Sequence, residues 1–300
     1  MIQLILNIGK KIKPLGFAGL SIYDVTTFFL KGLIEGAITT RASSLAFNFF
    51  LAFFPSIIVF FTLIPYIPID GLQETLMEVL SVILPQSTNE ITFNTLDDII
   101  NNPRSGLLSI GFILALYFSA NGMSSLIEAF NSSFHINEYR SLLRQKLLSL
   151  TLTFFLALLL IIAIGLIIFG KGAVNYLTDF EIISKFSADL ILYGKWFVIL
   201  AMLFSGISML FHFGPATTIK WKFFTAGSIL ATLGIITTSI GFNYYIIHFS
   251  QYNKIYGSIG TLMIILIWMY FNSIILLTGF ELNASISNAK ENKESSKKEL

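Results

Sequence analysis

The chain contains no cysteine and little charge. Of its 300 residues, 12% are charged and 55% are hydrophobic, and the mean hydropathy is +0.78. The charged share is about half that of a typical soluble domain, which argues against a soluble enzyme. The absence of cysteine excludes disulfides and thiolate metal sites. The net charge of +2 is too small to predict nucleic acid as a partner.

Motifs that carry chemistry in soluble enzymes are also missing. The three histidines, His135, His212 and His248, are scattered, and no two of them lie at metal-ligand spacing from each other. The sequence has no phosphate-binding loop, no Gly-x-Ser-x-Gly elbow and no glycine-rich dinucleotide fingerprint. We therefore expect no catalytic residue, no cofactor, no metal and no enzyme activity, and a metal-dependent nuclease finds no ligands here.

A long uncharged run is the most informative feature that is present. No charged residue occurs between Lys254 and Glu281, and about 20 apolar residues suffice for a helix to cross a bilayer. A turn is expected where this run begins, at residues 256–260, because two glycines lie there. With five earlier apolar runs, the sequence predicts six membrane spans, at residues 44–69, 107–130, 147–169, 190–213, 223–249 and 261–282.

Shorter helices are expected outside these spans. Apolar residues between Ile22 and Ile38 recur at helical spacing among charged ones, which predicts an amphipathic helix at the membrane interface. The connection 70–104 is long enough for a small helical cap outside the membrane. The expected fold is all-α, a bundle of about six transmembrane helices. Its predicted segments are the cytoplasmic N-terminus with the interfacial helix, 1–43, the transmembrane domain including the cap, 44–284, and a charged cytoplasmic tail, 285–300.

The basic residues predict the orientation of this bundle. Most of the 19 lysines and arginines fall on one side of the predicted spans, at Lys10, Lys11, Lys13, Lys31, Arg41, Arg140, Arg144, Lys146, Lys220, Lys222, Lys290, Lys293, Lys297 and Lys298. The opposite connections hold only Arg104, Lys171, Lys185 and Lys254. Because positive residues collect on the cytoplasmic side, both termini are expected in the cytoplasm, which requires an even number of spans.

Three predicted helices carry polar or small residues at steps of three and four, which place each set on one helix face. The sets are Arg41, Ser44, Asn48, Ala52 and Pro55, then Tyr117, Asn121, Ser124, Glu128 and Asn131, and finally Gly227, Ala231, Gly234, Thr238 and Gly241. The third set favours close helix packing. The first two predict polar faces that are turned away from lipid.

Ten residues are candidates for lining a cavity: Arg41, Asn48, Pro55, Tyr117, Asn121, Ser124, Glu128, Asn131, Arg140 and Glu281. Ionisable groups cost about 2.5–3.5 kcal/mol at the centre of a membrane helix, so the charged candidates rank above the amides. Pro55 is expected to kink its helix. Two interpretations stay open. The polar groups line a substrate cavity, or they serve helix packing, with a structural ion pair between one of the arginines and one of the carboxylates.

Several motifs resemble the YihY/BrkB family of bacterial membrane proteins. They are the run 41–47 followed by Phe53-Phe54-Pro55, the run 129–131 with Arg140, Gly214-Pro215 with Trp221, and the run 256–260 through Trp268 to 279–282. The similarity covers about residues 20–285. Phe47 and Asn48 stand where the family usually has tyrosines, and Ala52 stands where it commonly has a serine.

The resemblance implies an inner-membrane bundle of about six helices with little defined biochemistry. Some members carry an old label as ribonuclease BN and others a link to virulence and envelope resistance, and the nuclease label finds no support in these residues. We expect an envelope transporter of a lipid or another amphiphile, because polar faces and Pro55 suit an interior cleft. The alternatives are a non-transporting scaffold for envelope assembly, and an intramembrane enzyme with Glu128 and Glu281 in one cavity. Membrane lipids are the expected partners, and a second copy or an envelope protein stays open.

Overall fold

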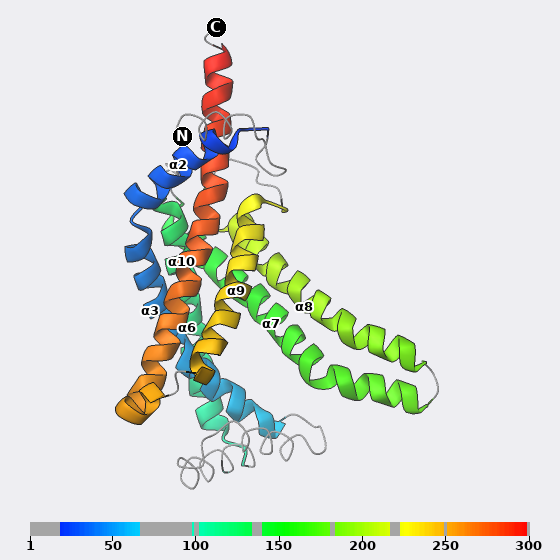
Figure 1. Ribbon diagram of the computed structural model, residues 1–300. Coiled ribbons are helices and arrows are strands. Elements are labelled where there is room, and N and C mark those ends of the chain that lie inside the picture. The colour runs from blue at the N-terminus through cyan, green and yellow to red at the C-terminus, as the bar shows by residue number, and fades with distance from the viewer. Residues whose placement is uncertain are drawn as a thin grey trace. The chain divides into compact units, whose positions relative to one another are not determined.

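A computed structural model describes residues 19–66, 98, 102–133, 140–180, 184–216, 223–248 and 251–298 (Figure 1). Its elements are α2 (Ile22–Glu35), α3 (Ile38–Leu63), the 3-10 turn η1 (Ile64–Tyr66), α6 (Ser105–Asn131), α7 (Leu142–Asp179), α8 (Lys185–Phe213), α9 (Ala226–His248) and α10 (Gln251–Lys298). Among the described residues, six segments are long and apolar enough to cross a membrane: Ile38–Tyr66, Ser105–Asn131, Leu142–Ile167, Asp189–Phe213, Ala226–Ile246 and Leu262–Glu291. The predicted all-α fold with six spans is confirmed.

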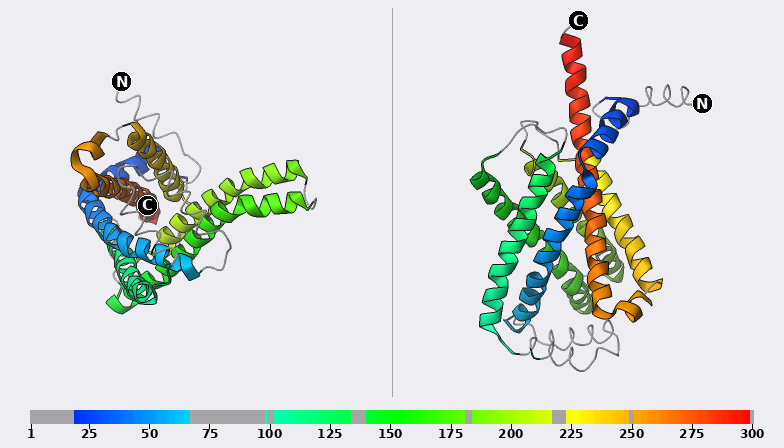
Figure 2. Two further views of the ribbon diagram at one scale, coloured as in Figure 1. Left: turned by 90° about the horizontal axis from the view of Figure 1, so that it is seen from below. Right: turned by 90° about the vertical axis from the view of Figure 1, so that its left-hand side faces the viewer.

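The last helix is longer than the sequence predicted. α10 is assigned as helix from Gln251 to Lys298, so the turn expected at residues 256–260 does not interrupt the helix, although the first part of α10 runs in a different direction from the rest (Figure 2). A glycine inside a helix costs only about 1 kcal/mol relative to alanine, which neighbouring helical residues can offset. At its other end the helix continues beyond the predicted span into the charged tail.

Helix α2 lies in the segment predicted to be amphipathic. A left-handed residue, Ala37 with φ 45°, separates it from α3. Its buried Val25 packs in one cluster with Leu20, Ile286 and Ala289, so one face of α2 covers the later part of α10. A location at the membrane interface stays a prediction for α2. The cap predicted at 70–104 lies outside the described residues, except for residues 98 and 102–104.

The chain divides into two units, and the smaller one is Phe47–Gly122. Within it, α3 and α6 approach closely at two glycines. A Cβ built on Gly111 would lie 3.1 Å from the side chain of Ile58, and one on Gly122 would lie 3.0 Å from the ring of Phe49. The absence of a side chain at these two positions therefore permits the close contact of the helices.

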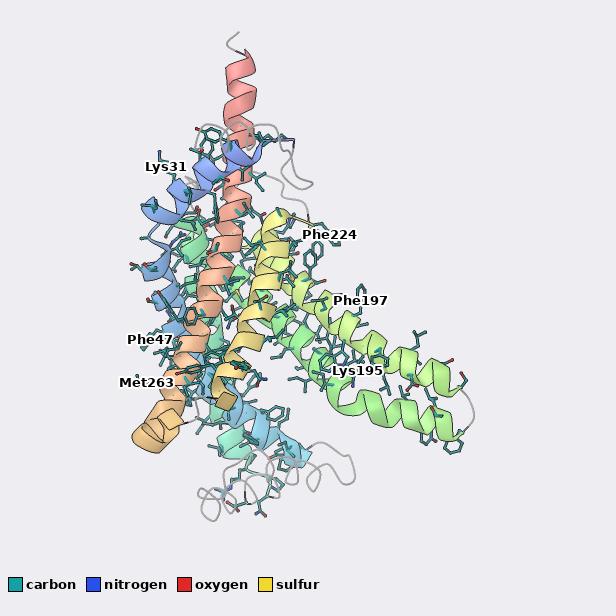
Figure 3. The ribbon with its side chains drawn as sticks, viewed as in Figure 1. Lys31, Phe47, Lys195, Phe197, Phe224 and Met263 are labelled. Atoms are coloured by element: carbon teal, nitrogen blue, oxygen red, sulfur yellow. The ribbon has the colours of Figure 1, made fainter. Side chains whose placement is uncertain are left out.

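The larger unit combines Met1–Ala46 with Met123–Leu300. Within it, α7 and α8 run side by side and point away from α9 and α10 (Figures 1 and 2). Much of the apolar surface of this pair is exposed, as at Phe197 of α8, whose side chain projects outward and is 74% exposed (Figure 3). A continuous apolar surface of this kind is unusual on a soluble monomer, whereas membrane lipid would cover it.

Candidate functional site

Arg41 and Glu281 form a buried ion pair between the start of α3 and the later half of α10. Arg41 Nη2 lies 2.5 Å from Glu281 Oε1, and the two side chains are 10% and 0% exposed. Arg41 Nη1 also donates to the carbonyl of Ala129 at 2.6 Å, and the Ser133 hydroxyl donates to Glu281 Oε2 at 2.8 Å. Buried charges are stable only when paired and hydrogen-bonded in this way. The structural ion pair, one of the two interpretations of these residues, is therefore present.

Both arginine candidates bind carbonyls at helix C-termini. The last four carbonyls of a helix have no N–H partner inside the helix, and Arg41 reaches one of them at the end of α6. Arg140 donates to the carbonyls of Phe213, Gly214 and Pro215 at the end of α8, at 3.0, 3.0 and 2.8 Å. Partial burial lowers the pKa of Arg140 from its ordinary value, yet an arginine stays charged in proteins. A positive charge at these positions also interacts favourably with the helix dipole.

We expect Arg140→Lys to destabilise the protein although it keeps the positive charge. A single ammonium group cannot replace a planar guanidinium that spans three carbonyls, and hydrogen bonds from charged groups contribute about 1.5–3 kcal/mol each. The free energy of unfolding in detergent, measured by denaturant titration, should therefore fall by about 2 kcal/mol. Arg144→Lys, at an exposed position of α7, is the matched control and should change little. Equal stability of the two variants would contradict the capping role of Arg140.

Asn131 and three aromatic rings connect the ends of α6 and α8 to each other and to the interior of α10. The side-chain oxygen of Asn131 accepts a hydrogen bond from the backbone N–H of Ala216 at 2.7 Å. Next to it, Phe130 stacks on Phe280 with ring centroids 4.2 Å apart, and Phe211 packs edge-on against both rings. All three rings are fully buried. Asn131 therefore has a packing role, and nothing in a sequence with 30 Phe distinguished Phe211.

Glu128 and Glu281 have different partners. The exposed Glu128 carboxylate accepts a hydrogen bond from Gln145 Nε2 at 3.0 Å, whereas Glu281 is ion-paired with Arg41. The arrangement gives no support to an enzyme built on these two carboxylates. In the part of the chain that the structure describes, no three His, Asp or Glu side chains are placed to hold a metal.

The other five candidates are divided between the two units. Asn48 and Asn121 are half-buried in the smaller unit, and Pro55 is buried within an α3 that continues as a helix on both sides of it. Tyr117 is 60% exposed, in contrast to the interior position predicted for its face. Ser124 is half-buried and belongs to the larger unit. The polar face of α6 is therefore exposed at Tyr117 and half-buried at Asn121 and Ser124.

The ridge of small residues on α9 contacts α10 over only part of its length. Gly227 and Gly279 lie so close that a Cβ on either would clash with the backbone oxygen of the other. Farther along, a Cβ on Gly234 would lie 2.6 Å from the side chain of Ile275. A Cβ on Gly241, by contrast, would meet no atom of the described part of the chain within 4 Å. The predicted packing role is correct for the first part of the ridge, and the helices separate beyond it.

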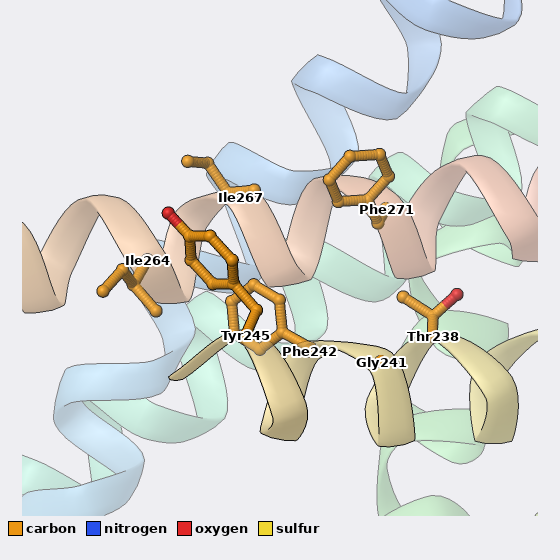
Figure 4. Close-up of a pocket in the computed structure, with 7 residues that line it drawn as sticks. All are labelled: Thr238, Gly241, Phe242, Tyr245, Ile264, Ile267 and Phe271. Atoms are coloured by element: carbon orange, nitrogen blue, oxygen red, sulfur yellow. The ribbon is translucent and has the colours of Figure 1, made fainter. Parts of the chain in front are cut away.

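An apolar pocket of about 340 Å³ lies where α9 and α10 separate (Figure 4). It is lined by Thr238, Gly241, Phe242, Tyr245, Ile264, Ile267 and Phe271. None of these residues carries a charge, and only two hydroxyl groups are polar. Figure 4 shows Thr238 and Phe271 toward one end of the pocket and Tyr245 and Ile264 toward the other. Its volume is near the lower limit of small-molecule sites, which range from about 300 to 1,000 Å³.

Asn283 caps the start of α9 and was not among the sequence candidates. Its side-chain oxygen accepts from the backbone N–H of Gly227 at 2.8 Å, and its amide nitrogen donates to the Thr225 hydroxyl at 2.8 Å. Its position one turn after Gly279, on the α10 face that meets α9, is the signal that could have identified it. We use the name helix-end cluster for Arg41, Asn131, Arg140, Glu281 and Asn283.

Comparison with known proteins agrees with this architecture. Residues 29–300 match the family model described as "Virulence factor BrkB". The chain is 29% identical over 252 residues to the ribonuclease-like protein YfkH of Bacillus subtilis. This alignment covers 84% of this chain and 91% of that protein. It is 25% identical over 280 residues to a UPF0761 membrane protein of Alteromonas mediterranea, with 90% of each chain covered. No solved structure matches it. The motif resemblance is thus confirmed, and the chain belongs to the BrkB family of membrane proteins.

Proposed function

We propose that this membrane protein transports a lipid or another amphiphile across the cytoplasmic membrane. The observation that carries the proposal is the apolar pocket between α9 and α10. Its lining residues fall within the spans Ala226–Ile246 and Leu262–Glu291, so membrane lipid would surround the pocket. A lining without charge suits an apolar chain and disfavours an ion, which would lose its hydration there without replacement.

In this proposal the polar residues of the helix-end cluster hold the helices together and do not bind substrate. Its hydrogen bonds satisfy the C-termini of α6 and α8 and the N-terminus of α9. They join the end of α6 to the residues after α8, and the start of α9 to α10. The pocket lies farther along α9 and α10, beyond their close contact at Gly227 and Gly279. Substrate would therefore meet the apolar residues of the pocket and not the ionised groups. The proposal includes no enzymatic activity.

The orientation in the membrane follows from the distribution of basic residues. We propose that both termini, and with them the helix-end cluster, are on the cytoplasmic side of the inner membrane, because lysines and arginines collect there. The pocket would then lie in the half of the bilayer that faces away from the cytoplasm.

Single cysteines can test this orientation, because the chain has none of its own. Ser184 before α8 and Ser141 before α7 are both exposed, and the proposed topology puts them on opposite sides. A membrane-impermeant maleimide should label Ser184→Cys in spheroplasts with an intact inner membrane. It should label Ser141→Cys only after that membrane is permeabilised. The reverse pattern would mean that the topology is inverted.

Reconstitution into vesicles tests the transport proposal. Purified protein is incorporated into phospholipid vesicles that contain a trace of fluorescent lipid, and an impermeant reductant then bleaches the lipid of the outer leaflet. We expect the protected inner-leaflet signal to decay faster than in vesicles without protein, with no leak of an encapsulated soluble dye. Decay equal to that of protein-free vesicles, for phospholipids and for single-chain amphiphiles, would refute transport.

A scaffold without transport activity is the second candidate. The exposed apolar surface of α7 and α8 favours it, because helices of an envelope protein or of a second copy can pack there in place of lipid. Stoichiometric co-purification with one envelope protein, together with lipid translocation equal to that of empty vesicles, would favour this candidate over transport.

A further inference from the structure

We infer that the pocket between α9 and α10 holds a single hydrocarbon chain of a membrane lipid, with the polar head at the Tyr245 end and the chain tip at the Thr238 end. This names the substrate class of the proposed transporter and, in that sense, rests on the proposed function. Binding of the chain can nevertheless be measured without any movement of lipid across the membrane.

The chemistry of the lining identifies the occupant. Phe242, Tyr245 and Phe271 contribute aromatic rings, and Ile264 and Ile267 contribute branched aliphatic side chains. The rings of Phe242 and Tyr245 are tilted against each other with centroids 6.1 Å apart. A polar head group placed among these side chains would lose hydrogen bonds to water and gain few in return. A hydrocarbon chain loses nothing there.

The volume suits one chain. About 340 Å³ is near the lower limit of small-molecule sites, so we expect the pocket to take one chain of a two-chain lipid. The remaining chain and the head group must stay outside the pocket, among the bulk lipids and at the interface. The pocket therefore selects for a chain and leaves the head group free to vary.

The position of the pocket along the helices gives the direction of the chain. Tyr245 is one residue from the end of the span Ala226–Ile246, and Ile264 is close to the start of the span at Leu262. Thr238 is seven residues, about two helical turns, deeper in the span. Tyrosine is typical of the membrane interface, where its ring is in lipid and its hydroxyl reaches polar groups. The Tyr245 end is thus nearer the interface than the Thr238 end, and Figure 4 shows these two ends of the pocket.

Gly241 offers a way to fill the pocket without disturbing the protein. A Cβ on Gly241 would meet no atom within 4 Å, so a larger side chain would extend into the pocket. Gly165 of α7 is the matched control. It also lies in a membrane span, its Cβ would also meet no atom within 4 Å, and it is outside the pocket. Gly241→Leu and Gly165→Leu therefore make the same chemical change in equally open positions.

Photo-crosslinking in vesicles tests the inference. Two phosphatidylethanolamine probes carry a diazirine, one at the chain terminus and one beside the ester, and crosslinked peptides are identified by mass spectrometry. In the wild-type chain, the terminal diazirine should label near Thr238 and Phe271, and the ester-proximal one near Tyr245 and Ile264. Gly241→Leu should lower this labelling about tenfold, because leucine displaces at least two chain methylenes. Gly165→Leu should leave it unchanged.

The results separate this inference from the proposed function. If the pocket is labelled in the expected order but the reconstituted protein translocates no lipid, binding of the chain is supported and transport is refuted. Lipid translocation together with labelling that Gly241→Leu does not reduce would support transport and refute binding of the chain in this pocket. If Gly241→Leu fails to fold, the positions of the labels on the wild-type protein still test whether the chain occupies the pocket. Labels in reversed order along the pocket, or no labels on it, would overturn the inference.

Discussion

Glu281→Ala should lower the free energy of unfolding by about 3–5 kcal/mol, because it leaves a buried arginine without its carboxylate. Glu281 is fully buried, and its two oxygens accept from Arg41 and Ser133 at 2.5 and 2.8 Å. The substitution also leaves a cavity where the carboxylate lay, between Arg41 and Ser133. We expect the loss in denaturant titrations in detergent, together with a lower yield of monodisperse protein.

The matched control for this prediction removes both charges. Arg41→Leu combined with Glu281→Leu leaves no unpaired charge, and apolar replacement of a buried ion pair is often neutral or stabilising. The double variant should therefore be more stable than Arg41→Leu alone or Glu281→Leu alone. Such a result is the signature of direct coupling between the two residues. A double variant as unstable as the sum of the single ones would show that the ion pair does not couple the two residues.

Gly227→Ala should cost about 1–3 kcal/mol or more, because the added methyl group would occupy space taken by the opposite helix. The new Cβ would clash with the backbone oxygen of Gly279 and lie 2.6 Å from the side chain of Asn283. Backbone atoms cannot move aside as the tip of a side chain can. The helices would have to separate, which would also stretch the hydrogen bond from Gly227 to Asn283. Thermal unfolding followed by size-exclusion chromatography measures the loss.

Gly165→Ala makes the same chemical change as Gly227→Ala, but we do not expect it to destabilise the protein. Its Cβ would meet no atom within 4 Å, and alanine favours a helix over glycine by about 1 kcal/mol. Gly165→Ala should therefore leave stability unchanged or raise it slightly. If both variants lose the same stability, glycine is required for a reason other than the contact between α9 and α10.

The six spans could be predicted from the sequence because length and hydropathy are local properties. Partners were harder to predict. The helical spacing placed Arg41 on a polar face, but its carboxylate partner is 240 residues away, and spacing alone left two arginines and two carboxylates as alternatives. The structure selects one pair and assigns Arg140 to the end of α8. The turn expected at residues 256–260 failed because helix formation overrides two local glycines.

The pocket could not be predicted from residue types. Gly227, Gly234 and Gly241 share one face of α9 and are the same residue, yet the first two contact α10 and the third faces open space. The difference depends on where the two helices touch and where they separate, and residue types along one helix do not contain that information. The ridge therefore predicted close packing along its full length, whereas the structure shows contact followed by separation.

The rate of lipid translocation by Gly241→Leu vesicles, measured beside wild-type and Gly165→Leu vesicles of equal protein content, tests the central claim most directly. If the pocket between α9 and α10 carries the lipid chain, Gly241→Leu should translocate at about a tenth of the wild-type rate. Gly165→Leu should match the wild type. Equal rates in all three preparations would contradict a role for this pocket in transport.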